Sequence, residues 1–162
     1  MNNKKLRGSE NSKVPYSCVF GQLTDSIDIL MEGNIKVVIV VFQPFGLYQL
    51  TKIPGSKLRN SLIEADLIFG NQVLRLHQQL CEVNNLKEII LLTENFLVDQ
   101  FLKSGNTDTN SLPQLVRFII EKKGAISVKE LTKYSELNER KLQRLFLERI
   151  GLSAKRFIQI IK

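Results

Sequence analysis

A stretch of eight residues without an apolar side chain divides this chain into two parts of different character. Residues 104–111 read SGNTDTNS, and a segment this rich in turn formers is typical of a linker between modules. The apolar content of the whole chain, 43%, is that of an ordinary globular protein, so each part can bury a core. We therefore expect one module at residues 14–103 and another at residues 112–162.

The positive charge of the protein is concentrated in the second module. Residues 112–162 contain 12 Lys/Arg and 5 Asp/Glu, whereas residues 1–111 contain 11 of each. A basic module points to nucleic acid, because the phosphate backbone carries a dense negative charge. Helix-cap signals in the same region indicate that this charge lies on a folded surface. Double-stranded DNA is therefore the expected partner.

The first module combines short apolar runs with helical periodicity, which predicts an α+β fold. Gly33-Asn34 is a turn signal between two of the apolar runs, and these two are expected to pair as a hairpin. The predicted strands are residues 18–20, 27–31 and 35–42. The predicted helices are residues 45–52, 70–83 and 86–103. A sheet of so few strands is only marginally stable alone, so we expect a small partial sheet covered by helices. Residues 1–13 are expected to be disordered.

The sequence lacks the residue clusters that catalysis or metal binding would need. His77 is the only histidine, and no Cys, His and carboxylate cluster has the spacing of a metal or catalytic site. Cys18 and Cys81 are expected to be buried thiols without a redox or metal role. We expect no enzyme activity, no metal and no cofactor.

Membrane insertion and secretion are also not indicated. The longest apolar run, residues 35–42, is interrupted by Lys36 and is far shorter than the ~20 residues of a membrane helix. The basic amino end is not followed by the apolar stretch of a signal peptide. The sequence predicts a cytoplasmic protein without membrane contact.

The second module shows clear helix start and stop signals. Apolar spacing predicts a helix over residues 112–123, with Gly124 placed to end it. Ser127 and Glu130 have the spacing of a capping box, which predicts a short second helix from Val128. Asn138 then provides a cap for a third helix over residues 139–150. A short helix, a turn and a second helix of this kind predict a helix–turn–helix.

The third of these helices has an apolar face and a polar face. At 100° per residue, the apolar face consists of Leu142, Leu145 and Phe146. The opposite face consists of Arg140, Gln143, Arg144 and Leu147. An Arg/Gln face alone is more often solvated surface, but the cap, the short helix, the turn and the local charge favour entry into a DNA major groove. Arginine pairs with guanine and glutamine with adenine there, so the candidate base contacts are Arg140, Gln143 and Arg144.

A fourth helix is expected after Gly151, with Ser153 as its cap. Lys155 and Arg156 lie in its first turn, where cations oppose the helix dipole unless an anion binds. Two readings stay open for this pair, a phosphate site or two exposed surface charges. The candidate phosphate contacts are Lys141, Ser153, Lys155 and Arg156.

Residues 126–131, 137–146 and 151–157 resemble the first helix–turn–helix of AraC-type bacterial transcription regulators. In that family the base-reading positions correspond to Arg140, Gln143 and Arg144. Residues 20–24 and 41–46 also resemble the tail of the sensor domain that precedes the DNA-binding part. The resemblance implies a bacterial transcription regulator with a partial cupin-like sensor at residues 14–103, and a homodimer and a small-molecule effector as candidate partners.

This sequence departs from the family pattern at three points. Thr132 stands where the family usually has a small residue, and Glu136 stands where it has a glycine. The family binds DNA with two helix–turn–helix units joined by a long helix, and this chain stops at Lys162, inside that joining helix. We therefore expect a truncated regulator with one recognition helix. The alternative is a protein-interaction or ligand-binding module in which the helices at residues 70–103 pair with a partner.

Overall fold

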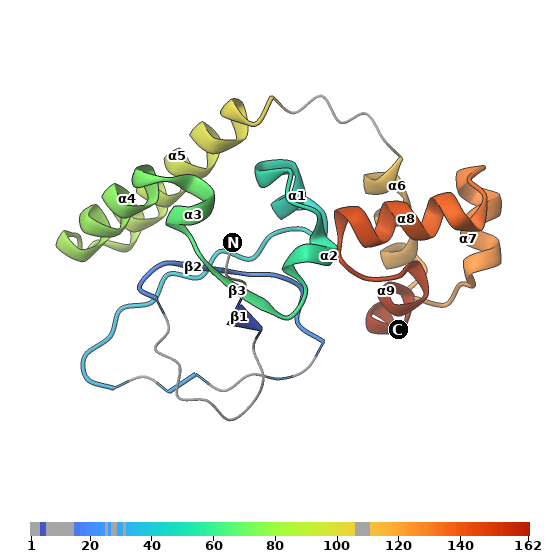
Figure 1. The fold of residues 1–162 in the computed structure, drawn as a ribbon, viewed down its shortest axis with the longest axis horizontal. Coiled ribbons are helices and arrows are strands. Elements are labelled where there is room, and N and C mark those ends of the chain that lie inside the picture. Colours follow the sequence, from blue (N-terminus) through green and yellow to red (C-terminus); the bar gives the residue numbers. More distant parts are fainter. Residues whose placement is uncertain (1–3, 6–14, 25, 27–28, 31, 106–110) are drawn as a thin grey trace.

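Two lobes lie side by side along the long axis of the molecule (Figure 1). The computed structural model describes residues 4–5, 15–24, 26, 29–30, 32–105 and 111–162. Residues up to 105 form a lobe that contains a small sheet and helices, and residues 111–162 form a purely helical lobe. The protein therefore has the α+β fold expected from its sequence. None of the helices formed by the described residues has the length and apolar content of a membrane span.

The described strands form one small antiparallel sheet in the order β1-β3-β2. These strands are β1 (Lys4–Lys5), β2 (Cys18–Phe20) and β3 (Ser61–Glu64). Strand β2 was predicted, and it pairs with β3 in a register that sets Cys18 opposite Glu64. Strand β3 was not predicted, because four residues carry too little of the two-residue alternation to be recognised. Residues 1–13 were expected to be disordered, and strand β1 shows that this prediction was wrong at Lys4–Lys5. The rest of that segment lies outside the described residues.

The predicted hairpin is wrong wherever the structure describes it. Residues 35–43 contain no strand, and the side chains of Ile39 and Val41 are 78% and 87% exposed. Ile29 and Leu30 are also outside any strand, while residues 27, 28 and 31 lie outside the described residues. Strand propensity produces a strand only where a neighbour completes the hydrogen-bond ladder, and no described strand pairs with this segment.

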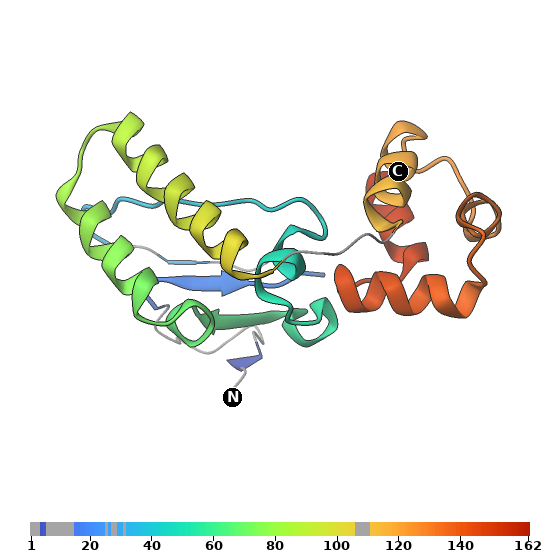
Figure 2. The same ribbon diagram turned by 90° about the horizontal axis from the view of Figure 1, so that it is seen from above.

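The helices of the first lobe agree with the predicted ranges and add two short ones. They are α1 (Gly46–Thr51), α2 (Gly55–Leu58), α3 (Asp66–Phe69), α4 (Asn71–Glu82) and α5 (Leu86–Lys103). Helices α4 and α5 pack side by side (Figure 2), and Phe69 of α3 meets Phe96 of α5 edge to face with ring centroids 5.6 Å apart. The side chain of Lys36 donates hydrogen bonds to the carbonyls of Leu80 and Val83 near the end of α4. These bonds connect the segment of residues 35–43 to the pair of helices α4 and α5.

The second lobe contains the larger part of the buried core. Its helices are α6 (Leu112–Glu121), α7 (Val128–Ser135), α8 (Glu139–Arg149) and α9 (Ala154–Ile161). Their apolar faces bury one continuous cluster, composed of Leu112, Leu115, Val116, Ile119, Leu131, Leu142, Phe146, Ile150, Leu152, Ala154, Phe157 and Ile158. All four predicted helices of this module are confirmed. The first ends at Glu121 because Lys123 and Gly124 turn into the left-handed region, with φ of 50° and 67°.

The two lobes touch through a close contact between backbones. Helix α2 packs against the carboxyl end of α8, as both ribbon views show (Figures 1 and 2). At this point a Cβ atom on Gly55 would lie 2.5 Å from the Gly151 nitrogen, and one on Gly151 would lie 2.6 Å from the Gly55 oxygen. Phe45 packs on the core of the second lobe. The Arg149 guanidinium lies 4.0 Å from the centre of the Tyr48 ring.

This contact predicts that Gly151→Ala is more destabilising than Gly105→Ala. Both glycines have positive φ (93° and 58°), so both alanine variants should lose roughly 1 kcal/mol of unfolding free energy from backbone strain. Only Gly151 meets backbone atoms, and the overlap should cost about 1–3 kcal/mol more. Urea unfolding of the two variants measures the difference. Equal midpoints would contradict the backbone contact between the lobes.

Candidate nucleic-acid interface

Helix α7 begins with the predicted capping box. The Ser127 Oγ accepts a hydrogen bond from the Glu130 N–H at 3.2 Å, and the Glu130 Oε2 accepts from the Ser127 N–H at 2.7 Å. The Ser127 hydroxyl also donates to the same carboxylate oxygen at 2.7 Å. These bonds from Ser127 hold the pKa of Glu130 below its ordinary value. The start of α7 is therefore fixed by local hydrogen bonds.

The two residues that depart from the AraC-type pattern are Thr132, which lies within α7, and Glu136, which lies in the turn between α7 and α8. Thr132 is half-buried, and its hydroxyl donates to the Lys129 carbonyl at 2.8 Å. The preceding turn of α7 therefore satisfies the hydrogen bonding of this hydroxyl. Glu136 adopts a left-handed conformation with φ of 57°, which a side chain with a Cβ disfavours. The chain thus keeps a turn that suits glycine although it has a glutamate there.

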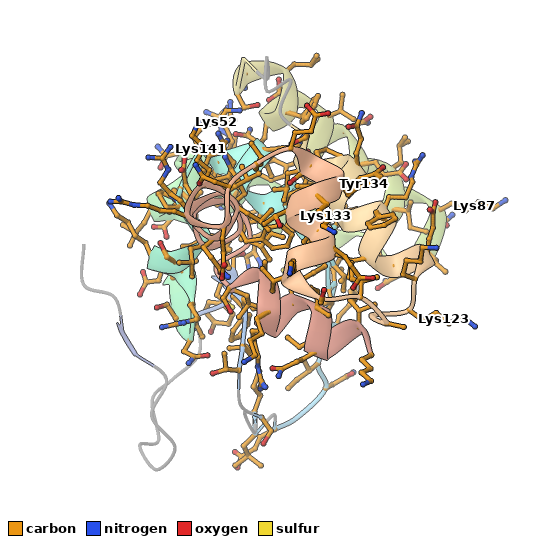
Figure 3. All side chains as sticks on the ribbon, turned by 90° about the vertical axis from the view of Figure 1, so that its right-hand side faces the viewer. Lys52, Lys87, Lys123, Lys133, Tyr134 and Lys141 are labelled. Atoms are coloured by element: carbon orange, nitrogen blue, oxygen red, sulfur yellow. The ribbon has the colours of Figure 1, made fainter. Side chains whose placement is uncertain are left out.

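Two completely buried side chains set the rotation of α8. Leu142 and Phe146 both have 0% exposure within the core of the second lobe, while Asn138 caps the helix by accepting from the Lys141 N–H at 2.9 Å. Arg140, Lys141 and Arg144 are exposed. Lys141 extends outward from α8 in Figure 3. Among the described residues, no acceptor binds the guanidinium of Arg140 or Arg144, so both remain available to an outside partner.

Gln143 occupies a different position from the two arginines. It is half-buried, and its Oε1 accepts a hydrogen bond from the Ala154 N–H at 3.3 Å. Ala154 is the first residue of α9, so this bond joins the middle of α8 to the start of α9. The glutamine that the sequence assigns to base reading therefore also contacts the backbone of the next helix.

Three of the four predicted phosphate contacts, Ser153, Lys155 and Arg156, lie at the start of α9, and the fourth, Lys141, lies in the first turn of α8. Ser153 caps this helix by accepting from the Arg156 N–H at 3.2 Å, and the side chains of Lys155 and Arg156 are exposed. Two of the first three amides of α9 thus already donate to side chains, those of Gln143 and Ser153. This end of the helix offers cationic side chains and the Ser153 hydroxyl hydrogen to a phosphate, but fewer backbone donors than the sequence suggested.

The contacts at the carboxyl end of α8 were not predicted from the sequence. Arg149 is half-buried against the ring of Tyr48, so this arginine does not extend the row formed by Arg140 and Arg144. Tyr48 and Arg149 are about 100 residues apart in the chain, and no local pattern links them. Only a signal spanning both lobes would have revealed this contact.

The cysteines and the histidine do not form a site in the described part of the chain. Cys18 is half-buried, and burial raises the pKa of its thiol. Cys81 is exposed on α4, with its sulfur 3.7 Å from the Nε2 of His77, so the expectation of a buried thiol was wrong for Cys81. No group of three or more His, Cys, Asp or Glu among the described residues is arranged to hold a metal ion.

Comparison with known proteins finds one family at the amino end. A family described as "Domain of unknown function (DUF6597)" matches residues 2–64. This range contains all three described strands together with α1 and α2, the helix that packs against α8. No curated protein and no solved structure matches the chain. The matched part is thus similar to an uncharacterised domain.

The strained turn predicts that Glu136→Gly stabilises the protein. Glycine adopts φ of 57° without a Cβ penalty, and the gain should be about 1 kcal/mol after its larger unfolded-state entropy is subtracted. Urea unfolding measures this free energy. Glu136→Ala is the matched control, because it removes the same charge but keeps the Cβ. A glycine variant no more stable than the alanine variant would show that the turn is not strained.

The capping box predicts an acid-sensitive contribution to stability. Because the pKa of Glu130 is lowered in the folded state from 4.5, its stabilising effect is present above the unfolded pKa and is lost as the pH falls through the folded pKa. The wild type should therefore lose more unfolding free energy between neutral and strongly acidic pH than Glu130→Gln, which cannot titrate. Unfolding curves at a series of pH values test this. Parallel pH dependences would rule out the contribution.

Proposed function

We propose that this protein is a sequence-specific, DNA-binding transcription regulator of AraC type that reads the major groove with α8. The observation that carries the proposal is the burial of Leu142 and Phe146, which turns Arg140 and Arg144 away from the core. The order of α7, a short turn and α8 is that of a helix–turn–helix, whose second helix enters the major groove. The proposal includes no catalytic role.

The surroundings of α8 have the charge that DNA binding needs. Arg140 and Arg144 supply guanidinium donors that fit the O6 and N7 acceptors of guanine. Lys141, Lys155 and Arg156 are exposed at the starts of α8 and α9, where they would contact phosphates on either side. A single helix–turn–helix makes few contacts, so its affinity should lie near the non-specific range of ~10⁻⁴–10⁻⁶ M. A second copy of the chain would raise it.

The position of the first lobe supports a regulatory role for it. It contains the segment similar to an uncharacterised domain, and its helix α2 contacts the end of α8. A sensor lobe in this place can influence DNA binding directly, because a shift of α2 would change the setting of α8. We propose that residues 14–103 are a partial sensor domain and that a small-molecule effector acts through this contact.

The proposal predicts that Arg144→Ala weakens DNA binding and that Lys87→Ala does not. Fluorescence anisotropy at low and moderate salt measures both, first with a pool of randomised duplexes and then with sites that the wild type selects from that pool. Loss of a bidentate arginine contact should cost about 1–3 kcal/mol, roughly a 5- to 150-fold loss of affinity for selected sites. Lys87 is exposed on α5, away from α8, so Lys87→Ala removes the same charge elsewhere (Figure 3).

Two outcomes of this experiment would reject the proposal. One is that neither the wild type nor the variants bind the pool at low salt. The other is that both variants bind as the wild type does, which would make the binding a general effect of net charge.

An exposed apolar face on α5 favours the alternative of a protein-interaction module. Leu91, Val98 and Leu102 lie on this helix with 56%, 57% and 73% of their surfaces exposed. Large exposed apolar patches often mark contacts with other proteins. In this alternative, α4 and α5 would pair with a partner, and Arg144→Ala would leave the function unchanged.

A further inference from the structure

We propose that Gln143 reads DNA only as a hydrogen-bond donor, so that it rejects cytosine and has no preference for adenine, because its amide oxygen is already used inside the protein. This inference rests on the proposed function of α8. Glutamine normally pairs with adenine by donating to N7 and accepting from the N6 amino group at the same time. In the structure the oxygen of Gln143 accepts a hydrogen bond inside the protein, which leaves only the amide nitrogen to donate to a base.

The Ala154 N–H needs an acceptor from outside its own helix. The first amides of an α-helix have no partner within the helix, and Ala154 is the first residue of α9. Ala154 is also completely buried, with 0% exposure, so water has little access to its amide. The neighbouring cap, Ser153, accepts from Arg156. Gln143 Oε1 is the acceptor that satisfies Ala154, at 3.3 Å.

Releasing this bond would leave a buried donor without a partner. Buried backbone N–H groups are almost always paired, because an unpaired one loses its hydration without replacement. A base edge in the groove cannot satisfy Ala154. The oxygen of Gln143 is therefore held at the start of α9 while α8 lies against DNA.

The remaining group of the side chain determines what Gln143 can read. The amide is planar, and its oxygen and nitrogen point in different directions from the same carbon. While Oε1 faces Ala154, both atoms cannot face one base edge, so bidentate pairing with adenine is lost. Nε2 carries two donor hydrogens and no acceptor. Donors match the O6 and N7 of guanine, the N7 of adenine and the O4 of thymine, whereas the N4 amino group of cytosine offers only another donor.

Three proteins test this proposal: the wild type, Gln143→Glu and Gln143→Ala. The glutamate keeps an oxygen for Ala154 and replaces the donor nitrogen by a second oxygen, with almost no change in shape. The alanine removes both atoms. Thermal unfolding and selection from a randomised duplex pool, followed by affinities for duplexes with each base at the position that Gln143→Ala no longer selects, give two independent readouts.

The expected result has two parts. Gln143→Glu unfolds at nearly the wild-type temperature, whereas Gln143→Ala unfolds at a lower temperature because Ala154 loses its acceptor. At the position concerned, the wild type disfavours cytosine by about tenfold and does not prefer adenine to guanine. Gln143→Glu loses this discrimination and favours cytosine, whose amino group donates to a carboxylate.

Several outcomes would overturn the proposal, and they are distinguishable from failure of the proposed function. A wild-type preference for adenine over guanine would mean that the whole amide turns to the base and pairs with it in bidentate fashion. Equal unfolding temperatures for Gln143→Ala and the wild type would mean that the bond to Ala154 is not needed. No change of base preference in Gln143→Ala would exclude Gln143 as a reader. Absence of wild-type DNA binding would reject both proposals, whereas site-specific binding that depends on Arg144 would retain the function alone.

Discussion

The burial of Phe146 is the interaction on which the rest of the second lobe depends. Its side chain is completely enclosed, and its ring lies 5.8 Å from that of Phe157, so it joins α8 to α9. Removing a buried phenylalanine costs about 3–5 kcal/mol, a large part of the stability of a small domain. Helix α8 therefore cannot rotate freely about its axis. The outward orientation of Arg140 and Arg144 is a consequence of this packing and needs no contact of its own.

The first lobe buries fewer apolar side chains than the second lobe and packs against it through α2. Its buried apolar residues among those described are Leu50, Leu58, Leu62, Ala65 and Val73. Its most apolar segment, residues 35–42, is extended and largely exposed because no described strand pairs with it. The contact of Gly55 with Gly151 allows the backbones of the lobes to touch without intervening side chains. The segment similar to an uncharacterised domain thus includes the helix that touches α8.

Gln143 shows how one residue can serve both structure and proposed recognition. A side chain that reads DNA is usually assumed to have all its polar atoms free. Here the oxygen of Gln143 completes the hydrogen bonding of α9, so the start of α9 and the outer face of α8 are set together. The cations of Lys155 and Arg156 lie in the first turn of the same helix. The proposed base contacts and the proposed phosphate contacts therefore depend on the same pair of helices.

By itself, the sequence determined the longer helices and the caps at which three of them begin. Ser127, Asn138 and Ser153 cap the helices that they were predicted to cap, because a cap joins groups only two or three residues apart. The tertiary structure decided what depends on distant partners: strand β3 pairs with β2, residues 35–42 pair with no described strand, and α2 rests on α8. It also decided that Gln143 bonds to Ala154, eleven residues away in the next helix. Local hydrogen bonds are encoded within a few residues, whereas pairing and packing depend on which surfaces the whole chain brings together.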